Sequence, residues 1–79
     1  MRVEILSLKK IEFQGQAQGL NVKTMSGEIT VLDHHVPLIT VLARGPATLI
    51  LPNGERRTIP IAGGFLEMGP ENSLTALVD

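Results

Sequence analysis

Glycine and proline recur along the whole chain, and their spacing limits most strongly what its 79 residues can form. The eight glycines and five prolines leave no window in which apolar residues keep the i, i+3, i+4, i+7 spacing of an amphipathic helix. Between them lie short runs of alternating apolar and polar residues, such as residues 11–14 and 28–32. Alternation with a period of two predicts half-buried strands, so we expect an all-β protein.

The strand-like runs fill the chain from end to end. They cover residues 3–8, 11–14, 17–24, 28–32, 38–42, 48–51, 56–61, 62–68 and 74–78. We expect about eight to ten short, mostly antiparallel strands at the spacing typical of a sandwich or barrel. Two sheets packed face to face bury one side of every strand. The predicted fold is therefore a two-sheet β-sandwich, formed as a single domain by residues 1–79.

The sequence Pro52-Asn53-Gly54-Glu55 is the clearest turn signal. Asparagine followed by glycine favours a type I′ turn, because both residues tolerate the positive φ that this turn requires. We therefore expect a hairpin that joins residues 48–51 to residues 56–61.

Two adjacent glycines, Gly63 and Gly64, precede Phe65. Glycine inside a strand usually marks a bulge or a close approach of another backbone. A phosphate-binding loop would need a helix and a lysine after the glycines, whereas a strand-like run follows here. We expect the glycines to have a structural role, with Phe65 filling the core.

Composition excludes several classes of protein. The formal net charge of −1 and the presence of only two aromatic residues, Phe13 and Phe65, argue against nucleic-acid binding, which typically uses a basic stripe and stacking aromatics. No cysteine is present, so there are no disulfides. We expect neither a signal peptide nor direct insertion into a membrane, because no apolar run approaches the roughly 18 residues of a membrane span.

Two groups of residues could be considered as a metal site or a catalytic site, and the sequence favours neither. Asp33, His34 and His35 are adjacent, but neighbouring side chains on an extended chain point to opposite faces, so we expect no metal site. Ser26, Asp33 and His35 could be proposed as a hydrolytic triad, but no nucleophile-elbow pattern surrounds Ser26. The chain is also small for a substrate pocket. We expect no catalytic residues and no cofactor.

The segment of residues 26–40, SGEITVLDHHVPLIT, resembles a signature of the epsilon subunit of F-type ATP synthases, E-G-E-x-G-V-L-P-G-H-A-P-L-L-T. The matching positions are Glu28, Val31, Leu32, His35, Pro37, Leu38 and Thr40. Residues 63–68, GGFLEM, resemble the family's G-G-F-x-E-V, and residues 72–79, NSLTALVD, resemble its N-x-V-T-V-L-A-D. The resemblance covers essentially the whole chain. Thr30 replaces a usual glycine, and Asp33-His34 replaces the family's Pro-Gly.

This resemblance implies a function for the domain. It implies a non-catalytic subunit of the rotor, or central stalk, that binds the gamma subunit and the ring of c subunits. It also implies that the subunit couples proton or sodium flow to ATP synthesis. The subunit would lie at the cytoplasmic face of the bacterial inner membrane, as a peripheral part of the complex. Glu28, Asp33, His34 and His35 are the expected contacts with the c-ring.

The resemblance has two further consequences. Many family members continue into a C-terminal helical hairpin, so a chain of this length is expected to be a short form without it. The free domain is also expected to expose an apolar face that gamma would cover. The alternative left open by the residues is a free-standing β-domain that binds a small ligand, which would require a defined pocket.

Overall fold

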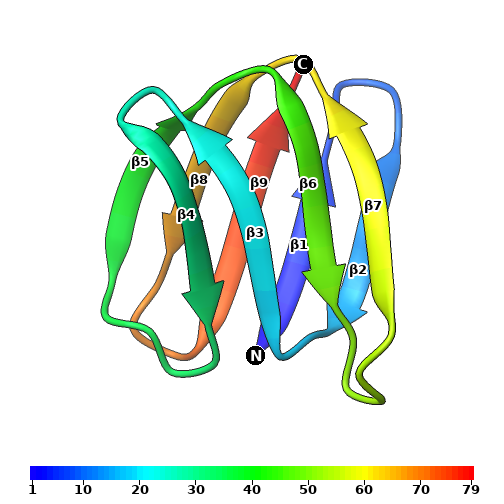
Figure 1. Cartoon of the computed structure of the whole chain (residues 1–79), viewed down its shortest axis with the longest axis vertical. Helices are drawn as coiled ribbons and strands as arrows, with labels where there is room; N and C mark the ends of the chain where they lie inside the picture. Colours follow the sequence, from blue (N-terminus) through cyan, green and yellow to red (C-terminus); the bar gives the residue numbers. More distant parts are fainter.

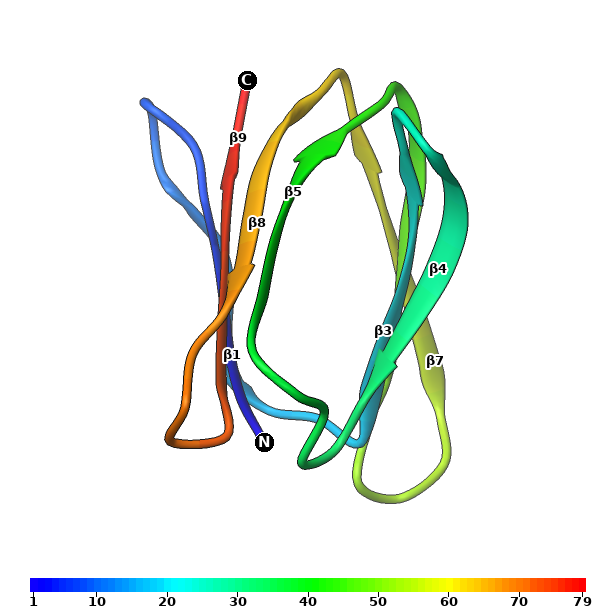
Figure 2. The same cartoon turned by 90° about the vertical axis from the view of Figure 1, so that its left-hand side faces the viewer.

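Nine strands form two sheets that pack face to face in a computed structural model, which describes residues 1–79 (Figures 1 and 2). The strands are β1 (Arg2–Leu6), β2 (Ile11–Gln16), β3 (Gly19–Thr24), β4 (Gly27–Leu32), β5 (Leu38–Leu42), β6 (Gly45–Ile50), β7 (Arg56–Ile61), β8 (Gly64–Met68) and β9 (Ser73–Val78). The prediction of an all-β sandwich with about eight to ten strands is confirmed. No helix capable of crossing a lipid bilayer is present.

We call the two layers sheet I and sheet II. Sheet I has the strand order β2-β1-β9-β8-β5, and sheet II has the order β4-β3-β6-β7. Only β1 and β9 pair in parallel, and all other neighbours are antiparallel. A single residue pair, Thr24 with Leu42, joins the sheets at the β3–β5 corner. At the opposite side, β2 and β7 do not pair, and the guanidinium carbon of Arg57 lies 5.7 Å from the centre of the Phe13 ring.

Sixteen buried apolar residues fill the space between the sheets. Fourteen of them come from alternate positions on the strands, as the period-two pattern requires, and the other two, Met1 and Ala17, lie just outside strands. Those that are almost completely buried and largest are Ile5, Leu20, Leu49, Leu66, Met68, Leu74, Val3, Val22 and Val31. Every buried side-chain nitrogen or oxygen has a hydrogen-bond partner, so the interior is apolar and polar groups in it are satisfied.

The structure corrects the prediction for Phe65, which points outward and is 58% exposed. Leu66 is buried in its place. The two residues are adjacent and both apolar, so their order alone does not say which one faces inward. Pairing of Leu66 with Ala76 on β9 and with Thr40 on β5 sets the phase of β8.

The hairpin between β6 and β7 forms where it was predicted, but its turn is not type I′. Gly54 has a φ of 89°, whereas Asn53 does not have a positive φ. The Gly54 amide donates to the Leu51 carbonyl, and the Leu51 amide donates to the Glu55 carbonyl. This is the pattern of a type I turn followed by a left-handed residue. Pro52 explains it, because its fixed φ suits the second position of a type I turn.

Gly63 and Gly64 have positive φ values of 148° and 140°. A Cβ atom on Gly64 would lie 2.0 Å from the Leu77 carbonyl oxygen on β9. The predicted close approach of another backbone is therefore confirmed, and it occurs where β8 begins to pair with β9.

Candidate interaction surfaces

An apolar band crosses the outer face of sheet I. We define it as Leu6, Leu77, Phe65 and Val41, which pair across β1, β9, β8 and β5, together with Ile39 on β5. Aligned residues on neighbouring strands project from the same face of a sheet. Ile39 is 75% exposed, Phe65 58%, Leu77 55% and Val41 44%. The exposed apolar face expected from the sequence is thus present, on the sheet that contains both β1 and β9.

The outer face of sheet II is mostly polar, although Leu32, which is 54% exposed, and Ile50 flank Gly19 on it. Asn21 donates to Glu28 over 3.1 Å and to Thr30 over 2.8 Å, and the Lys23 ammonium lies 3.4 Å from the Glu28 carboxylate. Thr48 and Thr58 face each other on β6 and β7, 3.3 Å apart. The Asn21 hydrogen bond, followed by Lys23, lowers the pKa of Glu28 below its usual value. The two outer faces therefore differ in character, and sheet I carries more of the exposed large apolar side chains.

The β4–β5 loop carries Asp33, His34 and His35 at the end of the sandwich where the chain begins (Figure 1). The Asp33 carboxylate accepts from the Met1 ammonium over 2.6 Å and from the Asn72 amide over 2.8 Å. The ammonium first and Asn72 second hold the pKa of Asp33 below its usual value. The His34 backbone amide donates to the Asn72 side-chain oxygen over 2.7 Å. This part of the loop is therefore tied to the β8–β9 turn.

His35 makes local hydrogen bonds within the loop. Its Nδ1 lies 2.7 Å from the Val36 carbonyl oxygen, which can only accept. Its backbone amide donates to the Leu32 carbonyl over 3.0 Å.

The predicted site residues fall into two groups. Glu28 is the second residue of β4, and Asp33 follows the last, so five strand steps of roughly 3.3 Å separate them by about 16 Å. Ser26 precedes β4 at the same end as Glu28, so the structure does not bring it together with Asp33 and His35. The sequence analysis missed Asn72, which lies 39 residues from Asp33.

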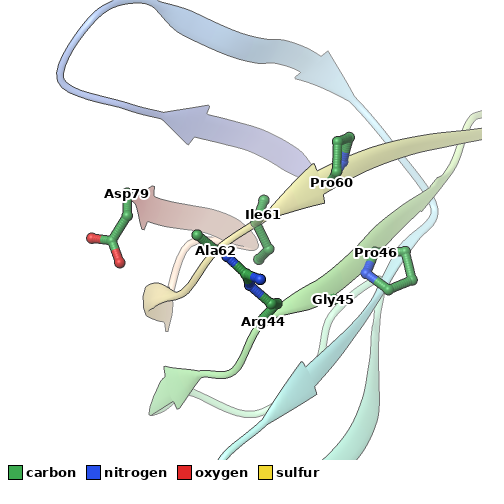
Figure 3. A pocket seen from close by; sticks show the side chains of 7 residues that line it. All are labelled: Arg44, Gly45, Pro46, Pro60, Ile61, Ala62 and Asp79. Atoms are coloured by element: carbon green, nitrogen blue, oxygen red, sulfur yellow. The ribbon is translucent and has the colours of Figure 1, made fainter.

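A surface groove of about 570 Å³ lies at the opposite end of the sandwich (Figure 3). Its lining residues are Arg44, Gly45, Pro46, Pro60, Ile61, Ala62 and Asp79. Pro46 and Pro60 pair in register on β6 and β7. Arg44 and Asp79 supply the charged groups, and they do not form an ion pair with each other. The groove offers no set of converging polar groups of the kind that fixes a small ligand.

Comparison with known proteins decides the family. The sequence profile of the ATP synthase delta/epsilon chain β-sandwich domain matches residues 1–79. The chain belongs to this family. It is 35% identical to the ATP synthase epsilon chain of Acinetobacter baylyi over 79 residues, which are all of this chain and 56% of that relative. It is 37% identical to the epsilon chain of Chromohalobacter salexigens over 68 residues, or 86% of this chain and 48% of that one.

The chain therefore spans about half the length of the curated epsilon chains that it matches. Solved structures agree on the fold. A chain in the mitochondrial ATP synthase of Euglena gracilis superposes with a TM-score of 0.89 at 18% identity, over 96% of this chain and 48% of that one. A chain in the central stalk and c-ring structure from Tetrahymena thermophila gives a TM-score of 0.83 at 17% identity, over 99% and 62%.

Proposed function

We propose that this epsilon-type domain is a non-catalytic subunit of the rotor of an ion-translocating ATP synthase. It binds the gamma subunit and the c-ring, and it transmits rotation between them. Membership of the family supports this role, and the apolar band is the observation that carries it. A patch of this kind on a small domain marks an interaction surface.

The band is the proposed contact with gamma. Phe65, Leu77 and Val41 lie next to one another on three adjacent strands, so one partner surface can cover them together. Fully burying a large apolar side chain contributes about 1.5–3 kcal/mol. Because Phe65 and Leu77 are already about half buried, each contributes roughly 1 kcal/mol on docking.

The proposed contact with the c-ring uses the polar residues of β4 and the β4–β5 loop, which are Glu28, Asp33, His34 and His35. Carboxylate and imidazole groups of this kind pair with arginine or with polar loops of a partner. Such exposed contacts set orientation and association rate more than affinity. The separation of Glu28 from the loop means that the ring contact extends along β4.

The experiment measures binding of the chain to gamma and to the c-ring from the same source. Phe65→Ser and Leu77→Ser are expected to weaken gamma binding about fivefold to tenfold each, since each removes about 1 kcal/mol of docking energy. Met25→Ser is the matched control, because Met25 is 72% exposed but lies outside the band, in the β3–β4 turn. Equal affinities for all three variants and the parent chain would refute the gamma contact.

A second set of variants tests the ring contact. Glu28→Ala and His35→Ala are expected to lower the association rate with the c-ring and to reduce its salt dependence. Glu55→Ala is the control, since Glu55 is an exposed carboxylate in the β6–β7 turn with only a local partner, Asn53. If the Glu55 variant alone changes the rate, the ring contact lies elsewhere.

A further inference from the structure

Two residues other than glycine adopt a positive φ, and they touch each other. His34 has a φ of 62° and Asn72 a φ of 55°. Residues with a Cβ rarely adopt this left-handed region, although asparagine, aspartate and histidine do so more readily than most. His34 occupies it in the β4–β5 loop, and contacts from elsewhere in the fold help to hold its backbone there.

Asn72 supplies these contacts with both ends of its side-chain amide. Its oxygen accepts from the His34 backbone amide over 2.7 Å, and its nitrogen donates to the Asp33 carboxylate over 2.8 Å. The same carboxylate oxygen accepts from the Met1 ammonium. The Asn72 backbone carbonyl accepts from the Arg2 amide over 3.1 Å.

The elements that meet here belong to different sheets. Asp33 and His34 follow β4 of sheet II, whereas Asn72 precedes β9 of sheet I. Figure 2 shows the β4–β5 loop crossing between the two sheets at the end where the chain begins. The loop has other ties, from the Asp33 amide to the Gln18 carbonyl and from the Met1 ammonium to the Asp33 carboxylate. The bond to the His34 backbone, however, comes from Asn72.

We infer that Asn72 is a positioning residue, which holds Asp33 and His34 in one conformation and so presents the neighbouring His35 to the c-ring. This inference rests on the proposed function, because it takes the β4–β5 loop to be part of the ring contact. Asn72 itself need not touch the ring, since its effect passes through the loop backbone.

The test measures amide hydrogen exchange at His34 and His35 in the chain, together with binding to the c-ring. Asn72→Gly keeps the left-handed backbone but removes the amide. It is expected to speed exchange at His34 at least tenfold and to weaken ring binding several-fold. Asn53→Ala is the control, because Asn53 lies in the β6–β7 turn at the same end and bonds only to Glu55.

A swap of the two partners separates positioning from general stability. Asn72→Asp keeps an acceptor for the His34 amide but sets a second carboxylate against Asp33, so it is expected to loosen the loop. Adding Asp33→Asn removes the repulsion between the two carboxylates and restores a donor between the two positions. It does so at the cost of the bond from the Met1 ammonium, because one Asp33 oxygen serves both partners. The double variant is therefore expected to recover slow exchange at His34 and to recover ring binding.

The outcomes are distinguishable. Unchanged exchange at His34 in Asn72→Gly overturns the inference whatever the ring binding. Faster exchange with unchanged ring binding, while His35→Ala still weakens binding, also overturns it and leaves the proposed function standing. If neither variant changes ring binding, the proposed contact fails, and the positioning role fails with it. Rescue of both readouts by the double variant supports the inference.

Discussion

Gly64 gives the sharpest test of how sheet I is assembled. A Cβ atom at this position would lie 2.0 Å from the Leu77 carbonyl oxygen and 2.9 Å from the Val78 Cα. Both are backbone atoms of β9, so no side-chain rotation relieves the overlap. An alanine at position 64 must push β8 away from the strand that it pairs with.

The loss of unfolding free energy has three parts. The left-handed backbone of an alanine costs about 1–2 kcal/mol. Overpacking adds about 1–3 kcal/mol, and disturbing the end of the β8–β9 ladder adds about 1 kcal/mol. The sum of about 3–6 kcal/mol is a large share of the roughly 4–12 kcal/mol expected for a chain of this length. At about 5 °C per kcal/mol for a domain of this length, Gly64→Ala is expected to lower Tm by about 15–30 °C.

Gly54→Ala is the matched control. Gly54 also has a positive φ, of 89°, but a Cβ atom there would meet nothing within 4 Å. Gly54→Ala is expected to lose only the free energy of holding an alanine in the left-handed region, which lowers Tm by about 5–10 °C. Calorimetry and urea titration of the two variants measure the difference. Equal losses would refute the argument that backbone overlap, rather than conformational strain, requires glycine at position 64.

Three further predictions test the packing and the loop. Leu66→Ala is expected to cost about 2–5 kcal/mol of unfolding free energy because it leaves a cavity in the core. Phe65→Ala is expected to cost about 0.5–1 kcal/mol in the free chain because it loses only cross-strand contacts, and urea titration of both variants measures the difference. Asp33 has a lowered pKa in the folded chain, so its carboxylate stabilises the fold fully above the unfolded pKa of about 3.9, and this stabilisation is lost as the pH falls through the lowered pKa. In urea titrations below about pH 3.9, the unfolding midpoint of Asp33→Asn is therefore expected to fall less steeply with pH than that of the parent chain. Arg57→Ala is expected to cost about 0.5–1 kcal/mol through the lost contact with the Phe13 ring, and Arg57→Lys is expected to retain part of it.

The strands could be predicted from the sequence because each one is a local pattern. The alternation in residues 28–32 predicts a strand without knowledge of its neighbours, and the two glycines before Phe65 predict a close approach of another backbone. The same rules failed at Phe65, where two adjacent apolar residues leave the inward phase undetermined until β5 and β9 pair with β8. They also failed at the β6–β7 turn, where Pro52 outweighs the Asn-Gly preference.

The contacts of the β4–β5 loop lay outside the reach of sequence reasoning. Asp33, His34 and His35 were singled out, but their partner Asn72 lies 38 residues from His34. Taken alone, Asn72 is an ordinary turn residue after Pro70 and Glu71. Only the fold, which places the β8–β9 turn beside this loop, shows that its side chain has two specific partners.

The place of β9 in sheet I also determines when the domain can fold. This strand is the last in the chain, yet it lies between β1 and β8 and pairs in parallel with the first strand. While the ribosome is still synthesising residues 73–78, β1 lacks one neighbour and the halves of sheet I stay apart. Contacts between residues so far apart in sequence slow folding. The nascent chain therefore exposes strand edges until β9 emerges, and during that interval it most needs a chaperone.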